Sequence, residues 1–232
     1  MILNGTDPHE DKPFFLKAIE MLVAGPDDIK ARVEEARARV LQKPNAAAMT
    51  AEELRLATAD AVIDHYARIT GRVGATTSAA AAIPGIGTVI ALVGATAADL
   101  AVSMKYQIEM VHGLAHLFGR DITDEEEQRL CYTIAGLGVA TQAGLLTFER
   151  FTVSSIREAA QRLIKGRVKR WFFELFKRLG LKLTQRGVLK LVPLGIGATF
   201  SYFSNRKLTR YIGRRARDFF MEEQGKHDAT AR

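Results

Sequence analysis

The sequence has little of several features that would mark particular classes of protein. Its 232 residues contain a single cysteine, Cys131, which excludes an internal disulfide and suits a reducing compartment. The N-terminus has no basic region followed by an apolar run and no small-residue cleavage site, so we expect a cytoplasmic protein without a signal peptide. No stretch of useful length alternates between apolar and polar residues, which argues against a β-sheet.

The chain also lacks the motifs of nucleotide binding and nucleophilic catalysis. Gly85 and Gly87 match the first two glycines of a dinucleotide-binding fingerprint, but Ile90 occupies the third position and no predicted strand precedes them. These glycines are not followed by the lysine of a phosphate-binding loop, and the sequence has no GxSxG motif. We therefore assign no catalytic residue and no cofactor, and we favour a protein that is not an enzyme.

What the sequence does have is helical periodicity along almost its whole length. The predicted helices cover, in order, residues 13–25, 27–42, 50–71, 84–119, 124–151, 156–180 and 193–220. Three pairs of residues have the spacing of a capping box and are expected to start helices: Thr50 with Glu53, Thr123 with Glu126, and Ser155 with Glu158. The pattern predicts one all-α domain built as a helical bundle.

Two stretches without charged side chains, residues 73–98 and 130–148, are long enough to cross a bilayer. Their abundance of glycine, alanine and threonine, however, favours helices that pack closely inside a bundle. The motif AIPGIGTV at residues 82–89 is echoed by LVPLGIGAT at 191–199. We predict two glycine-rich helices, each started by its proline and buried at the centre, where a leucine at Gly87 or Ala91 would overpack the core.

A lone carboxylate at the end of an apolar helix is costly to bury without a partner. Asp99 stands in that position, and Asn205 or Arg206 on the corresponding face of the second unit is a candidate partner. Asn205 is the partner that we predict, as a structural polar pair. The alternative is that Asp99 reaches water.

Residues 71–130, with the motif AIPGIG and the Asp99-Leu100 pair, resemble the EcsC family of bacterial proteins. Residues 192–220 resemble that family's closing segment with its Asn-Arg-x-Leu-Thr pattern. The resemblance covers residues 51–221 and implies a largely helical protein, in a family named from an operon that encodes an ABC transporter. It implies no catalytic residues. On this basis we predict a helical extension over residues 1–50, the main domain over 51–224 and a polar, frayed tail over 225–232.

Charge is distributed unevenly along the chain. Residues 1–130 carry 13 Lys or Arg against 19 Asp or Glu, whereas residues 157–217 carry 17 Lys or Arg against 2 acidic residues. A basic amphipathic segment with Trp and Phe is typical of helices that lie on anionic membranes. The candidate anion-binding residues are Lys165, Arg167, Lys169, Arg170, Trp171, Lys177, Arg178, Lys182, Arg206, Lys207, Arg210 and Arg214. We predict peripheral binding to anionic lipid or to a membrane protein at the inner membrane.

Three alternatives remain open at this stage. In the first alternative the basic segment is an ordinary bundle helix, with its aromatic residues in the core and its basic residues in solvent. In the second, the uneven charge of the chain drives self-association. Sequence-specific nucleic-acid binding is not expected, because no recognition motif accompanies the arginines. Finally, Glu109, His112 and His116 share one helical face and have the ligand types of a zinc or iron site, which would make the protein a metal-dependent enzyme.

Overall fold

A computed structural model describes residues 13–75, 85–93, 95–142, 147–164, 177–178 and 197–230 of the chain. Over these residues the chain has eight α-helices and no strand, which confirms the predicted all-α class. The helices are α1 (Phe14–Glu20), α2 (Pro26–Leu41), α3 (Ala51–Ala75), α5 (Ile86–Val93), α6 (Ala95–Leu117), α7 (Glu125–Gln142), α8 (Val153–Ile164) and α10 (Gly197–Thr230). Two short 3-10 turns, η1 (Ala46–Ala48) and η2 (Phe148–Arg150), lie between them.

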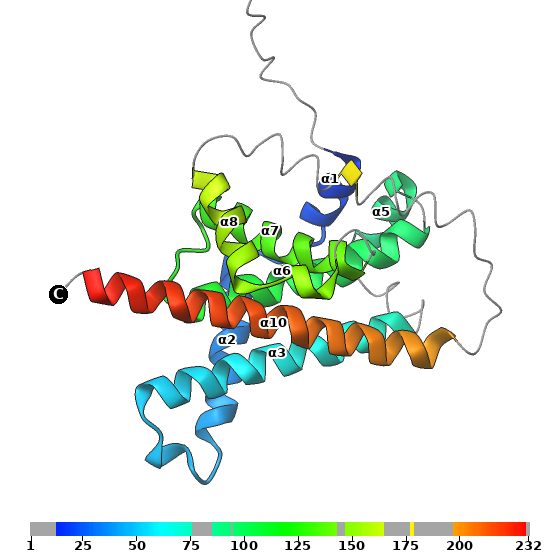
Figure 1. Ribbon diagram of the computed structural model, residues 1–232. Coiled ribbons are helices and arrows are strands. Elements are labelled where there is room, and N and C mark those ends of the chain that lie inside the picture. The colour runs from blue at the N-terminus through cyan, green and yellow to red at the C-terminus, as the bar shows by residue number, and fades with distance from the viewer. Residues whose placement is uncertain are drawn as a thin grey trace, which may run out of the picture.

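Helix α6 is the centre of the bundle. It contacts α1, α2, α3, α5, α7 and α10, and every side chain from Ala101 to Ala115 is buried except that of Tyr106. In Figure 1 the long α10 lies alongside α3, and α6, α7 and α8 lie on its other side in that view. Because α6 carries large apolar residues at nearly every turn, the other helices cover it from several directions and bury it on all sides.

Glycines allow α10 to approach its neighbours closely. A Cβ atom at Gly213 of α10 would lie 2.8 Å from Ile63 Cγ1 of α3 and 2.9 Å from Met110 Sδ of α6. At Gly138 of α7 a Cβ atom would overlap the side chain of Ile212. Both positions therefore hold helices at a separation that a larger residue would not permit.

The helix starts agree with the sequence in one case and differ in two. Thr50 and Glu53 form the predicted capping box, with N–H donors 2.7 and 3.2 Å from the reciprocal side-chain oxygens. Helix α7, however, is capped by Asp124, whose Oδ1 accepts bonds from the N–H groups of the second and third helical residues, and not by Thr123. Helix α8 is capped by Thr152, with Ser155 at the third helical position.

The prediction of a wholly buried helix from Pro84 to Leu100 is wrong for its first half. Among the residues of α5 whose burial the structure describes, 86–91, Ile86 and Val89 are buried, whereas Gly87, Ile90 and Ala91 are exposed, Ile90 by 44%. A Cβ atom at Gly87 would meet nothing within 4 Å, so the expected overpacking does not apply there. Glycine and alanine have little apolar surface to bury, and α5 instead packs on the bundle through Ile86 and Val89.

Other predictions concern the chain after α8 and the end of α10. The predicted start of the last helix at Pro193 lies outside the described residues. The predicted frayed tail from Gly225 is instead helical through Thr230. Across the helices that the structure describes, none combines the length and the hydropathy that a membrane span requires.

Candidate functional site

The most unusual feature of the core is an ionised cluster on α6. The Glu109 side chain has no exposed surface, and three donors surround it. Lys105, one turn earlier on α6, forms a short ion pair with Oε1. The guanidinium of Arg32 on α2 lies 2.7 Å from Oε2, and the backbone N–H of Ala24 lies 2.9 Å from Oε1. The carboxylate thereby joins α6, α2 and the corner between α1 and α2.

This arrangement follows from the cost of burying charge. A buried carboxylate is tolerated only where cations or hydrogen-bond donors replace the water it has lost. Lys105 is also buried and lies over the ring of Tyr106, with Nζ 4.4 Å from the ring centroid. The surrounding phenols respond to the same burial: desolvation, and then the charge of Glu109, raise the pKa values of Tyr66 and Tyr106.

One turn further along α6, His112 lies beside a cavity of about 130 Å³. His112 is 4% exposed, and neither ring nitrogen has a hydrogen-bond partner among the described residues. Burial lowers the pKa of His112 to about 4, against a weaker opposite effect of the Ile108 backbone. The imidazole is therefore neutral near pH 7, and a buried ring nitrogen without a partner costs about 1–3 kcal/mol.

The cavity lies at the α1–α2 corner and has both apolar and polar walls. Its apolar walls include Val23, Ile29 and Ile122, and its polar lining comes from Glu20, Gln128, His112 and Tyr132. The rings of His112 and Tyr132 meet edge to face at a centroid distance of 5.8 Å. Burial, followed by the charge of Glu20, raises the pKa of Tyr132. Ala24, whose N–H binds Glu109, lines the same cavity, so the ionised cluster and the cavity are neighbours.

The predicted metal ligands fall on this part of α6 but do not assemble into a metal site. Glu109 is already bound by Lys105, Arg32 and the Ala24 N–H, His112 is buried, and His116 is partly exposed. Within the described part of the chain, no three His, Cys, Asp or Glu side chains come together as a metal would need. The helical face on which the sequence predicted metal ligands thus carries the ion pairs of Glu109 and, one turn later, the cavity beside His112.

Sequence reasoning identified Glu109 and His112 but missed their partners. Lys105 could have been found, since it precedes Glu109 by four residues on an otherwise apolar helix, the spacing of a helical ion pair. Arg32 and Ala24 come from 77 and 85 residues away in the chain, and no local pattern points to them.

The predicted anion-binding residues divide into three groups. Six of them lie outside the described residues: Lys165, Arg167, Lys169, Arg170, Trp171 and Lys182. Four of the others are exposed: Lys177, Arg178, Lys207 and Arg214. Arg206 and Arg210 are partly exposed, and Arg210 binds Asp64 of α3 at 2.8 Å. For the predicted pair of Asp99 with Asn205, the structure describes the helical backbone at both residues but neither side chain.

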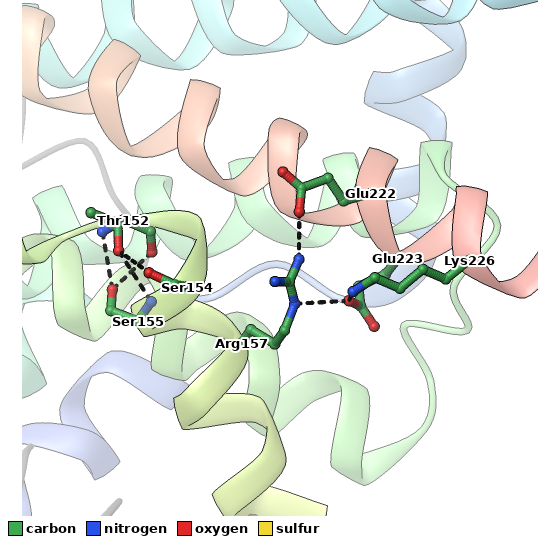
Figure 2. A network of polar contacts seen from close by, with 7 residues as sticks. All are labelled: Thr152, Ser154, Ser155, Arg157, Glu222, Glu223 and Lys226. Carbon is green, nitrogen blue, oxygen red and sulfur yellow. Dashed lines mark hydrogen bonds and ion pairs between the residues drawn. The ribbon is translucent and has the colours of Figure 1, made fainter.

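The charge of α10 changes sign along the helix. Residues 206–217 are basic, and Arg217 ends that stretch with an ion pair to Asp60 of α3 at 2.7 Å. Its last turns are acidic and hold α8: Figure 2 shows Arg157 of α8 between Glu222 and Glu223, while Lys226 lies 2.9 Å from Glu223. The ion pairs that α10 makes with α3 and with α8 therefore hold it between these two helices.

Comparison with known proteins assigns the chain to a family. The model of the EcsC protein family matches residues 10–222. The match begins well before residue 51, where the resemblance in the sequence began, so α1 and α2 lie inside the matched region. Neither a curated protein nor a solved structure matches the chain. Since the match covers most of its length, this chain belongs to the EcsC family.

Proposed function

We propose that this member of the EcsC family binds the surface of an anionic membrane through the basic stretch of α10, residues 206–217. Residues 206–217 contain six Lys or Arg and no Asp or Glu. Within this stretch Lys207 and Arg214 are seven residues apart, on one helical face, and both are exposed. This exposed basic face is the observation that carries the proposal.

The charge of this face is only partly neutralised inside the protein. Asp60 and Asp64 of α3 bind Arg217 and Arg210. No ion pair among the described residues joins Lys207 or Arg214 to an acidic group, and the guanidinium of Arg215 lies over the ring of Tyr211. A cation close to an anionic bilayer contributes about 1 kcal/mol, so a few such residues give measurable binding.

The basic segment before α10 in the sequence supports the same proposal. Residues 165–190 contain nine Lys or Arg against one Glu. Lys177 and Arg178, the two residues of this segment that the structure describes, are exposed. A lipid surface would engage this segment and the basic face of α10 together, and the loss of either would weaken binding.

Vesicle sedimentation tests the proposal. The purified protein should bind vesicles that contain phosphatidylglycerol and should not bind vesicles of pure phosphatidylcholine. It should dissociate from the anionic vesicles as the salt concentration rises, because salt screens the attraction between exposed charges. The double variant Lys207→Gln/Arg214→Gln should bind roughly 10–30-fold more weakly, from about 1 kcal/mol per cation. The matched control Arg37→Gln/Lys43→Gln removes two exposed cations near the end of α2 and should bind like the wild type.

Three results would overturn the lipid proposal. Equal binding to neutral and anionic vesicles, or to neither, would remove its electrostatic basis. Binding to native membranes but not to protein-free anionic vesicles would point to a membrane protein as the partner instead. Equal loss of binding in the two double variants would show that net charge, and not this face, is responsible.

A further inference from the structure

The cavity beside His112 has the properties of a small-molecule site, and it lies apart from the basic face of α10. Its volume of about 130 Å³ is several times the roughly 30 Å³ that one water molecule takes up in the liquid. An engineered apolar cavity of about 150 Å³ holds benzene, so this one suits an occupant of about five or six non-hydrogen atoms.

The lining indicates the chemistry of the occupant. A neutral imidazole has one N–H donor and one nitrogen acceptor, and neither nitrogen of His112 has a partner within the described residues. Gln128 donates its amide N–H to the Ile122 carbonyl at 3.1 Å, which holds the side chain at the cavity wall. Buried polar groups are normally satisfied, so the unpaired ring of His112 is a feature that an occupant would complete.

The charges around the cavity exclude an anion. The Glu20 carboxylate lines the cavity itself. Glu109, one turn away on α6, is already paired with Arg32 and Lys105, and Glu20 also interacts within the protein, so neither carboxylate favours a cation in the cavity. The walls formed by Val23 and Ile29 favour a compact ring or a short hydrocarbon body over a fully hydrated polar molecule.

We propose that the cavity at the α1–α2 corner binds a small uncharged molecule that carries a hydrogen-bonding group on an apolar body and is held by a ring nitrogen of His112. Pyrazole is a suitable probe: it is a flat ring of five non-hydrogen atoms with neighbouring N–H and nitrogen acceptor, and it is neutral at pH 7. Benzene is the control for shape, because it has nearly the same size and no hydrogen-bonding group.

The experiment titrates the full-length protein with pyrazole and with benzene, and follows binding by ligand-observed NMR. Pyrazole should bind saturably with a Kd on the order of 1 mM or tighter, within the range open to so small a ligand. His112→Phe keeps a ring of similar size and should weaken binding at least tenfold. His116→Phe, one turn further along α6 and outside the cavity lining, is the matched control and should bind like the wild type.

A second measurement needs no variant and keeps the test decisive if His112→Phe does not fold. The ring ¹⁵N resonances of His112 in the wild-type protein should shift as pyrazole saturates, while those of His116 stay in place. Unchanged binding in folded His112→Phe, or benzene binding as well as pyrazole, would overturn the proposal. Absence of saturable pyrazole binding, with the His112 resonances unmoved, would also overturn it and would leave water as the occupant.

Discussion

The carboxylate of Glu109 on α6 lies 2.7 Å from the guanidinium of Arg32 on α2, although 77 residues separate them in the chain. The same carboxylate accepts the N–H of Ala24 at the α1–α2 corner. Both helices at the N-terminal end are therefore fastened to the central helix by one buried side chain. This explains why α1 and α2 are integral to the bundle, in agreement with a family match that begins at residue 10.

The first prediction concerns that carboxylate. Glu109→Gln preserves its size but leaves the charges of Lys105 and Arg32 without a counter-ion, and breaking a buried pair costs about 3–5 kcal/mol. Urea denaturation should show this loss in the free energy of unfolding. The matched control is Glu125→Gln, which breaks an exposed pair with Arg129 and should cost less than about 1 kcal/mol. Similar losses in the two variants would contradict the proposed role of Glu109.

The second prediction is a pH dependence caused by His112. Its pKa in the folded state is about 4, below the ordinary value of 6.5, so only the unfolded chain gains this proton as pH falls between those values. Stability is therefore full above pH 6.5 and falls toward pH 4, by up to about 3 kcal/mol from this group. Glu20 of α1 lines the same cavity as His112, the Glu109–Lys105 pair lies one to two turns earlier on α6, and Tyr132 of α7, whose pKa is raised, stays neutral over this range.

Equilibrium unfolding at several pH values checks this dependence. His112→Phe should remove most of the slope between pH 6.5 and 4 and should keep the smaller slope due to His65 and to carboxylates such as Glu53 and Glu223, whose pKa values are lowered. His116→Phe should retain the wild-type slope. If the two phenylalanine variants keep the same slope, the proton taken up on unfolding does not belong to His112.

How far the sequence predicts this molecule depends on whether the information is local. Helical periodicity depends on residues three and four apart, so the all-α class and the box of Thr50 with Glu53 could be read directly. The burial of α5 could not be predicted in this way, because it depends on which other helices cover α5. The partners of Glu109 come from distant segments, and the polar face that looked like metal ligands is explained only once Arg32 is placed beside it.

The third prediction tests the start of α7. Thr123 and Asp124 are both suitable N-cap residues, and sequence spacing alone favoured Thr123 with Glu126. In the structure Asp124 Oδ1 accepts two N–H bonds of 2.9 and 3.1 Å, whereas the Thr123 hydroxyl donates to Asp121 in an exposed turn. Asp124→Ala should cost about 1 kcal/mol and Thr123→Ala less than about 0.5 kcal/mol by chemical denaturation. The reverse order would restore the capping box predicted from the sequence.

The last prediction uses two glycines of the same helix, α10. Gly213→Ala places a Cβ atom 2.8 Å from Ile63 and 2.9 Å from Met110, at the point where α10 meets α3 and α6. Overpacking of this kind costs about 1–3 kcal/mol. Gly225→Ala meets nothing within 4 Å and replaces a helical glycine by a better helix former, so it should stabilise by about 0.5–1 kcal/mol.

The comparison isolates packing, because the two substitutions change the same group in the same type of backbone. Thermal and urea unfolding should move in opposite directions for the two variants. A stabilising Gly213→Ala would mean that α10 lies further from α3 and α6 than the structure places it.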